Sequence, residues 1–333
     1  MKLFRHLGNL PKSVTGSVVA WGNFDGFHKG HQAVVRRTAA IAAELDAPLA
    51  VMTTEPHPSQ FFRPETPSFR LMSLRSKAQA LEAFGVDLLF VLPFDAALAG
   101  MPAEDFVREV LAGQIGARHV VTGYDQRFGR GRRGDAEMLR RMGAELGFGV
   151  TVVEPLEVDG RVYSSSRVRE HLRNGDPEQA ALLMGHWWRI EGRVEQGDQR
   201  GRTIGFPTAN VGWGDYLEPR LGVYAVRMHV EDGPHRGVHD GVANLGRRPT
   251  FGKTDLSFEV HLFDFAGDLY GAHVGVDMIG FIRPERKFDG LDALKAQIAA
   301  DGETARRVLA GPAAAPDRFP PATRRNSTGP GQS

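Results

Sequence analysis

Short apolar runs alternate with amphipathic stretches along the first half of the chain. The apolar runs lie at residues 17–21, 49–53, 87–92, 119–122 and 150–153. Between them, apolar residues recur with the helical period at residues 32–45, 74–84, 103–111 and 135–146. Nearly continuous apolar strands that alternate with helices are typical of a parallel sheet covered by helices on both faces. Ligands on such sheets bind beyond the carboxyl ends of the strands, so the loops that follow the strands are candidate sites.

The pattern becomes predominantly β-type after residues 169–184. The β-rich runs, which turn residues separate, are 188–194, 223–230, 241–244, 257–265 and 274–282. This spacing predicts an antiparallel barrel or sandwich, closed by a helix at residues 291–300. We therefore expect an α/β domain over residues 1–185 and a β domain over residues 186–310. A disordered tail over residues 311–333 is expected from its Pro, Gly, Ser and Thr content.

Composition narrows the class of protein. The net charge is +1, from 41 Lys+Arg against 40 Asp+Glu, and gives no reason to expect a nucleic-acid or membrane partner. The absence of cysteine excludes disulfides, thiolate nucleophiles and cysteine-based zinc sites. The chain starts without the apolar core of a signal peptide, and no apolar run reaches membrane-spanning length. We expect a cytoplasmic protein with no obligate protein partner.

A glycine-rich loop, GNFDGFHKGH at residues 22–31, joins the first apolar run to the first helix. Glycines let the backbone approach an anionic ligand closely, and a helix N-terminus supplies unpaired N–H donors. His28 and His31 are three residues apart at the helix start, so both rings can point towards a transferring phosphoryl group. A metal site on the histidine pair and a purely structural pair are the two alternatives.

The run SSSRVR at residues 164–169 follows the last strand of this half and enters a helix. Hydroxyl groups and an arginine at a helix start indicate a second set of phosphate ligands. The alternative is simple N-capping, which explains one serine but leaves the rest of the run and Arg169 without a role.

The segment GRVEQGDQRGRTIGFPTAN at residues 192–210 predicts a loop that wraps a nucleotide. It ends in Thr208 and Asn210, whose hydroxyl and amide oxygens are hard ligands suited to Mg²⁺. No Walker lysine motif is present, so a P-loop kinase is excluded, while a plain glycine-rich hairpin is the alternative. Further along, Glu259 lies in a strand-like run and is either a solvent-facing residue or a base for a substrate hydroxyl.

Together these segments resemble the prokaryotic bifunctional riboflavin kinase/FAD synthetase family. GNFDGFHKGH and SSSRVR are similar to its HxGH and SSTxxR elements, and GRTIGFPTAN, GVANLGRRPTFG, FEVHLFDF, GDLYG and FIRPERKF are similar to its kinase module in the same order. The resemblance covers residues 15–308 approximately. It implies a Rossmann-like nucleotidyltransferase domain that adenylylates FMN to FAD, followed by a six-stranded barrel that phosphorylates riboflavin to FMN. ATP would be the co-substrate and Mg²⁺ the cofactor.

The resemblance also implies residue roles. His28, His31 and Arg169 would act in adenylyl transfer, and Glu259 would be the base on the ribityl 5′-hydroxyl. In the first domain and its last helix, ATP would contact Gly22, Phe24, Asp25, Gly26, His28, Gly30, His31, Ser164, Ser165 and Arg169. In the second domain, ATP would contact Gly197, Arg202, Gly205, Phe206, Pro207, Thr208 and Asn210, and the last two would hold Mg²⁺. The flavin to be adenylylated would lie near His57, Pro58, Phe62, Asp125 and Phe128.

Two positions depart from the pattern of the family. Ser166 replaces a threonine and keeps its hydroxyl, whereas Gln126 replaces a phenylalanine beside the expected flavin. Phe62 and Phe128 could equally be core residues. Three other functions fit the same sequence: a flavin-sensing regulator, a kinase whose first domain is idle, and a nucleotidyltransferase acting on another phosphate ester.

Overall fold

The structure, a computed structural model, describes the whole chain except residues 9, 13, 159–160, 198–204, 251–252 and 312–333. Arg202 and the tail beyond residue 311 therefore lie outside the described residues. By its packing the chain divides into two compact units, which we describe separately. Of the described residues, unit 1 comprises Met1–Thr66 and Lys77–Tyr163, and unit 2 comprises Pro67–Ser76 and those from Ser164 onward.

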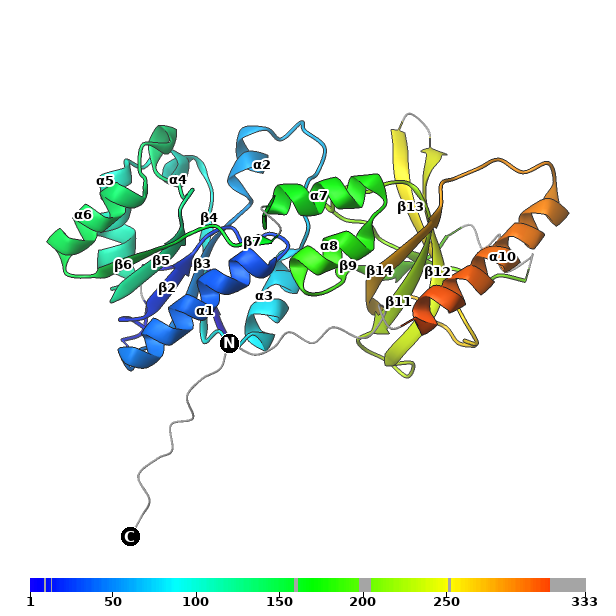
Figure 1. Cartoon of the computed structure of the whole chain (residues 1–333), viewed down its shortest axis with the longest axis horizontal. Helices are drawn as coiled ribbons and strands as arrows, with labels where there is room; N and C mark the ends of the chain where they lie inside the picture. The colour runs from blue at the N-terminus through cyan, green and yellow to red at the C-terminus, as the bar shows by residue number, and fades with distance from the viewer. Residues whose placement is uncertain (9, 13, 159–160, 198–204, 251–252, 312–333) are drawn as a thin grey trace, which may run out of the picture. The chain divides into compact units, whose positions relative to one another are not determined.

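Unit 1 contains a parallel sheet of six strands in the order β1-β4-β3-β2-β5-β6 (Figure 1). The strands are β1 (Lys2–Phe4), β2 (Val18–Trp21), β3 (Leu49–Glu55), β4 (Leu88–Pro93), β5 (His119–Gly123) and β6 (Gly149–Val153). The parallel sheet expected from the sequence is thus confirmed. The sequence missed β1 at the sheet edge, because three residues are too few to show an alternating pattern.

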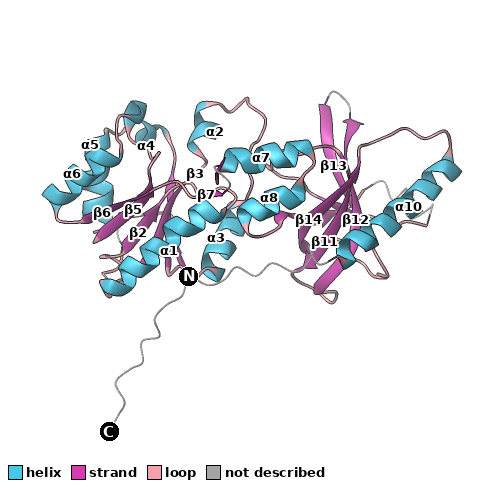
Figure 2. Cartoon of the chain, in the orientation of Figure 1, coloured by secondary structure: helices cyan, strands magenta, loops and turns pink. Residues whose placement is uncertain are grey.

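Helices follow the strands of unit 1 (Figure 2). They are α1 (Lys29–Glu44), α2 (Pro58–Phe62), α3 (Leu74–Ala83, which begins in unit 2), α4 (Ala96–Gly100), α5 (Ala103–Asp105) and α6 (Ala136–Leu146). A π-helix, η1 (Phe106–Gln114), continues α5, and a 3₁₀ turn, η2 (Arg130–Arg132), precedes α6. A short hairpin, β7 (Glu157–Val158) with β8 (Arg161–Val162), ends the unit.

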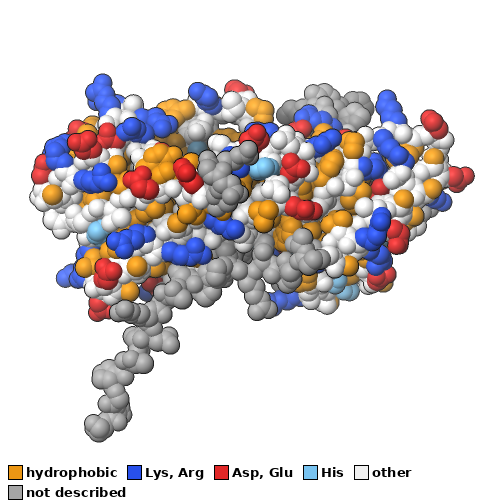
Figure 3. All heavy atoms as spheres, viewed as in Figure 1, with side chains coloured by type: hydrophobic (Ala, Val, Ile, Leu, Met, Phe, Trp, Pro, Cys, Tyr) orange, Lys and Arg blue, Asp and Glu red, His pale blue; other side chains and the backbone are white. Residues whose placement is uncertain are grey.

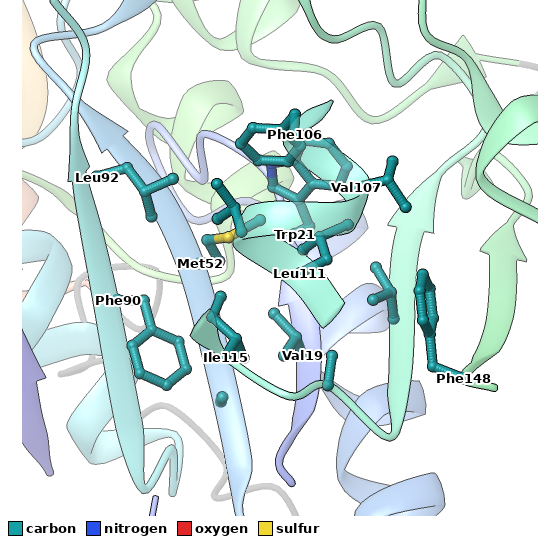
Figure 4. Close-up of a cluster of buried hydrophobic side chains, with 14 of the residues drawn as sticks. Val19, Trp21, Met52, Phe90, Leu92, Phe106, Val107, Leu111, Ile115 and Phe148 are labelled. Atoms are coloured by element: carbon teal, nitrogen blue, oxygen red, sulfur yellow. The ribbon is translucent and has the colours of Figure 1, made fainter. Parts of the chain in front are cut away.

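Alternating strand residues build the core on the η1 face of the sheet. Val19, Trp21 and Met52 point to the same side and pack with Phe106 and Leu111 of η1 (Figure 4). The residues between them face the opposite side, where α1 packs on β2 and β5. A sheet covered on both faces leaves only its edges and strand ends for ligands, which is why the loops after the strands matter.

Unit 2 contains a closed antiparallel barrel in the order β10-β13-β12-β11-β14-β9, with β9 returning to pair with β10. Its strands are β9 (Trp188–Glu195), β10 (Ala209–Val211), β11 (Gly222–Val230), β12 (Gly237–Thr250), β13 (Lys253–Leu262) and β14 (His273–Arg283). The barrel alternative of the sequence-based expectation is confirmed. The three-residue strand β10 was not separated from the glycine-rich loop, again because it is short.

Three helices accompany the barrel. α7 (Ser165–Asn174) and α8 (Pro177–Met184) precede it, and α10 (Leu291–Ala310) follows it. Ala305 and Leu309 of α10 pack on outward-facing residues of β11 and β12, including Val223 and Val242, to form a second core outside the barrel. The expected final helix is present and is longer than its apolar pattern indicated.

The segment Pro67–Ser76 packs on the barrel although it is distant in sequence. Nε1 of Trp188 donates to the carbonyl oxygen of Leu71 at 2.9 Å, and Oγ of Ser73 donates to Oε2 of Glu191 at 3.0 Å. Leu71 and Trp188 are both buried.

On the face shown in Figure 3, basic and acidic side chains are interspersed, and neither sign of charge dominates. This distribution agrees with the near-neutral net charge. In the part of the chain that the structure describes, no helix combines the length and apolarity needed to cross a membrane.

Candidate active sites

The loop between β2 and α1 is held in an unusual backbone conformation by buried aromatic side chains. Phe24 and Phe27 have φ values of 50° and 36°, in the left-handed region that most residues avoid at a cost of about 1 kcal/mol. Both rings are fully buried, and that of Phe27 packs edge-on against Phe84 with centroids 5.1 Å apart. Oγ1 of Thr53 also donates to the carbonyl oxygen of Asn23 at 3.2 Å. The loop is thus fixed from the core side.

His28 and His31 are brought together at the start of α1. His28 is the N-cap residue, and its Nδ1 accepts from the backbone N–H of His31 at 3.4 Å. The two rings stack with centroids 3.6 Å apart. A Cβ at Gly30 would lie 3.1 Å from the His28 ring, so the glycine makes room for it. Because Nδ1 accepts, the neutral His28 ring carries its proton on Nε2 as a hydrogen-bond donor.

The expected flavin residues lie in the loops after β3 and β5, which flank β2 in the sheet. His57 caps α2 through Nδ1, which accepts from the backbone N–H of Ser59 at 3.1 Å, and Pro58 is the first helical residue. Phe62 is 64% exposed and touches the rings of Phe61 and Phe94. An exposed aromatic ring at the carboxyl edge of a parallel sheet is well placed to stack on a planar ligand.

The residues after β5 divide between surface and core. Asp125 is exposed, whereas Phe128 is only 6% exposed and packs on Trp21 with centroids 5.0 Å apart. Phe128 also pairs with Gly134 through two backbone hydrogen bonds, which close a turn at this point. Gln126 donates its backbone N–H to the carbonyl oxygen of Gly123 and is partly exposed.

The serine–arginine run begins α7 and belongs to unit 2. Ser164 is the N-cap, and its Oγ accepts from the backbone N–H of Arg167 at 3.3 Å. Ser165 is the first helical residue. Nε of Arg169 donates to the carbonyl oxygen of Phe69 at 2.7 Å, and the guanidinium lies over the Phe69 ring. The capping alternative therefore applies to Ser164, and Arg169 makes a structural contact with Phe69.

In the barrel, the structure brings Thr208, Asn210 and Glu259 into one group. Oγ1 of Thr208 lies 3.4 Å from Oε2 of Glu259, and Asn210 on β10 is the direct cross-strand partner of Glu259 on β13. Oγ of Ser257 donates to the other carboxylate oxygen at 3.1 Å, which orients the Glu259 side chain. The arrangement places the Glu259 carboxylate and the Asn210 amide on neighbouring strands, with the Thr208 hydroxyl just before β10.

The described part of the glycine-rich loop adjoins this group. A Cβ at Gly197 would collide with the Asn210 side chain, so the glycine permits the close approach of the loop. Gly205 has a left-handed φ of 90°. The Phe206 ring packs on His261, whose Nδ1 donates to the carbonyl oxygen of Pro207 at 2.8 Å.

A buried charge cluster stabilises the barrel away from this group. Asp277 accepts from Nε and Nη2 of Arg189 at 2.6 and 2.7 Å, and lies 2.8 Å from Nε2 of His229. Burial alone would raise the pKa of Asp277, but the hydrogen bonds from Arg189 and His229 hold it below the usual aspartate value. The cluster ties β9, β11 and β14 together.

Two family models match the chain in succession. Residues 10–167 match the family described as FAD synthetase, and residues 184–309 match the family described as riboflavin kinase. A relative from Escherichia coli K12, named bifunctional riboflavin kinase/FMN adenylyltransferase, is 40% identical over 93% of this chain and 98% of its own length. The chain belongs to this bifunctional family.

Further comparisons agree with the assignment to the riboflavin kinase/FMN adenylyltransferase family. A relative of the same name from Bacillus subtilis strain 168 is 40% identical over 88% of this chain and 92% of its own length. A crystal structure described as a macrolide-efflux protein from Streptococcus pneumoniae is 32% identical, with a TM-score of 0.81 over 91% of this chain and 98% of that one. The chain is thus a riboflavin kinase and FAD synthetase, as the sequence resemblance implied.

The structure places further residues beside both candidate sites that the sequence did not single out. Ser257 contacts the Glu259 carboxylate, and Asn244 is the cross-strand partner of Glu259 on its other side. Phe94, at the end of β4, contacts the exposed Phe62 ring. Ser257 was within reach of sequence reasoning, because it lies two residues from Glu259 and so shares its face of the strand. The other two require knowledge of which strands are neighbours.

Proposed function

We propose that Glu259 is the general base of the riboflavin kinase half and that Thr208 and Asn210 hold the phosphates and magnesium of ATP. The proposal rests on the grouping of the three side chains, with Thr208 Oγ1 3.4 Å from Glu259 Oε2. A carboxylate beside a phosphoryl-transfer centre can accept the proton that a substrate hydroxyl loses as its bond to phosphorus forms. The ribityl 5′-hydroxyl of riboflavin attacks the γ-phosphorus, and FMN and ADP result.

The donor set fits Mg²⁺. A hydroxyl and an amide oxygen are hard, neutral ligands, and Mg²⁺ takes few protein ligands while it keeps waters and phosphates. When bound by Thr208 and Asn210, Mg²⁺ would offset the negative charge of the transferring phosphates. Ser257, which donates to Oε1 of Glu259, keeps the carboxylate oriented towards the reacting hydroxyl.

For the FAD synthetase half, we propose that His28, His31 and the N-terminus of α1 stabilise the α-phosphoryl group of ATP. The FMN phosphate attacks that group, and pyrophosphate leaves. Support comes from the stacked imidazoles at the helix start and from the rigid glycine-containing loop before them. From the sequence we retain the proposal that Ser164, Ser165 and Arg169 also contact the ATP phosphates.

The flavin of the adenylylation site is proposed to lie along the loops after β3 and β5. His57, Pro58, Phe62 and Asp125 are the exposed or half-buried residues expected there, and the exposed Phe62 ring offers a stacking surface. Phe128 would contribute through the edge of a largely buried ring, as a support for the loop that carries Asp125.

The organisation of the chain around these two centres is also a proposal. We infer an adenylyltransferase domain over residues 1–185 and a kinase domain over residues 186–310, in a cytoplasmic enzyme that needs no protein partner. The riboflavin kinase model begins at residue 184, beside the proposed boundary, and the FAD synthetase model ends before it, at residue 167.

Chromatography of reaction products tests the two centres together. Incubation of the purified protein with riboflavin, ATP and Mg²⁺ is expected to give FMN first and FAD later, whereas a flavin sensor would give neither. Chelation of Mg²⁺ should stop both products. If FMN forms from riboflavin but supplied FMN never yields FAD, the chain is a kinase only and the proposed roles of His28 and His31 are wrong.

A further inference from the structure

The strand face that carries Glu259 continues onto β12, on the side away from β10. Asn244 is the direct cross-strand partner of Glu259, and Gly246 is that of Ser257. Directly opposed residues of antiparallel strands project from the same face, with Cβ atoms about 4.5–5.5 Å apart. Leu245, between the two β12 residues, is buried inside the barrel. The outer face therefore carries one patch, formed by Asn244, Gly246, Ser257 and Glu259. Asn244 is exposed there.

Glu285 occupies the place that Gly246 leaves empty. A Cβ at position 246 would collide with Oε1 of Glu285 and would approach Nδ2 of Asn244 to 3.4 Å. Gly246 does not have a left-handed φ, so a side chain at this position would disturb the contact with the Glu285 carboxylate and not the backbone. Glu285 comes from the loop that leaves β14 towards α10. A second carboxylate thus lies against Gly246, the partner of Ser257, and an amide lies on the residue opposite Glu259.

In the barrel, β13 lies between β10 and β12, so the two sides of Glu259 can be told apart. Thr208 and Asn210 lie on the β10 side of Glu259, and Asn244 lies on the β12 side. In phosphoryl transfer the attacking and leaving oxygens lie roughly in line, on opposite sides of the phosphorus. With ATP on the β10 side, the attacking alcohol approaches from the β12 side.

We propose that Asn244 and Glu285 bind the internal hydroxyl groups of the polyol chain of the acceptor and so present its terminal hydroxyl to Glu259. The inference rests on the kinase centre proposed above. A carboxylate accepts hydrogen bonds from two hydroxyls, and an amide can both donate to and accept from them. A site that hydrogen-bonds hydroxyl groups discriminates against an analogue that lacks them when the bound acceptor excludes water, because its own polar groups are then left unpaired. The patch would make the kinase selective for polyol-bearing flavins.

The test compares two acceptors in the full-length protein. One is riboflavin, and the other is a flavin whose chain keeps the terminal hydroxyl but lacks the internal ones. For Glu285→Ala and Asn244→Ala, kcat/KM for riboflavin is expected to fall about ten- to hundredfold, as for a lost hydrogen bond to a polar or charged group. The KM for ATP should stay unchanged, and both variants should match the parent on the deoxygenated flavin. Gly246→Ala should reproduce the Glu285→Ala loss, because its methyl group displaces the carboxylate.

A matched control and three outcomes decide the inference. Glu303→Gln alters an exposed carboxylate of α10 and should keep the parental kinetics on both acceptors. The inference is overturned if the variants raise the KM for ATP instead, or if they lose as much on the deoxygenated flavin as on riboflavin. It is also overturned if the parent makes FMN and the variants match it on riboflavin. A parent that makes no FMN would overturn the kinase centre itself, which is a separate result.

Discussion

The two proposed catalytic regions of this chain are built in opposite ways. His28 and His31 belong to one continuous segment, whose backbone is held in place by buried side chains such as Phe27. Thr208 and Glu259 are 51 residues apart and meet only because β10 and β13 pair in one register. A loop site of the first kind can be recognised as a motif, whereas a strand-face site of the second kind depends on long-range pairing. The two should respond differently to mutation.

The largest expected effect separates the two chemistries. Glu259→Gln keeps the shape of the side chain but cannot accept a proton, so riboflavin phosphorylation should fall by a factor of about 10² to 10⁴. FAD formation from supplied FMN should remain at the parental rate. His28→Ala should give the reverse result, with FMN accumulating. Product chromatography with each starting flavin measures both. If Glu259→Gln also lost FAD formation from supplied FMN, or if His28→Ala lost FMN formation from riboflavin as strongly as FAD formation, the two regions would not be separate centres.

The second prediction addresses how the histidine loop is anchored. Phe27→Ala removes a fully buried ring that packs on Phe84 and should lower the free energy of unfolding of unit 1 by about 3–5 kcal/mol. FAD formation should be lost at a lower temperature than FMN formation, because the ring supports only the first region. Activity remaining after heating, measured separately for each product, checks this. Parallel loss of both activities would contradict independent anchoring.

The third prediction concerns the charge cluster that ties the barrel strands together. Asp277→Asn should destabilise unit 2 by about 3–5 kcal/mol at pH 7, because Arg189 and His229 lose a buried anionic partner. The pKa of Asp277 is lower in the folded state, so its contribution is present above the unfolded value of about 4 and is lost as pH falls below it. The difference between parent and variant should therefore be constant near neutrality and shrink below about pH 4.

Urea unfolding followed by tryptophan fluorescence between pH 7 and pH 3 measures that difference, since Trp187, Trp188 and Trp213 belong to unit 2. Asp264→Asn is the control, because Asp264 also pairs with an arginine but is exposed, and exposed pairs contribute little. A parent–variant difference that persists unchanged at pH 3 would show that Asp277 does not act through its charge.

The fold was largely predictable because its signals are local. Apolar runs placed five of the six strands of the parallel sheet, and the glycines and turn residues separated most of the barrel strands. The exceptions were the three-residue strands β1 and β10, in which pairing partners, and not sequence pattern, create the strand. The packing of Pro67–Ser76 on the barrel was likewise invisible, because it depends on contacts such as that of Trp188 with Leu71.

The sites show the same division between local and long-range information. The stacking of His28 on His31 follows from a spacing of three residues at a helix start. The sequence left Phe62 and Phe128 alike as ligand-binding or core residues, and the structure separates them, with Phe62 exposed and Phe128 buried. Glu285 could not have been found from the sequence, because no residue near it in the chain indicates that its carboxylate lies against Gly246.

The smallest predicted effect tests whether a small shift of the His28 ring slows FAD formation without lowering the stability of the protein. Gly30→Ala adds a methyl group 3.1 Å from the His28 ring, which must shift by a few tenths of an ångström, while alanine favours the helix. Misplacement of a catalytic group by about 1 Å can cost a hundredfold, so FAD formation should fall about three- to tenfold without a lower melting temperature. FMN formation should not change.

Gly100→Ala, at a position with open space around it, is the control and should preserve both rates. Because Gly30→Ala alters geometry and not chemistry, a parental rate of FAD formation would mean that the position of the His28 ring does not limit adenylyl transfer. In that case only the Glu259 site would show that catalysis depends on how the surrounding backbone is held.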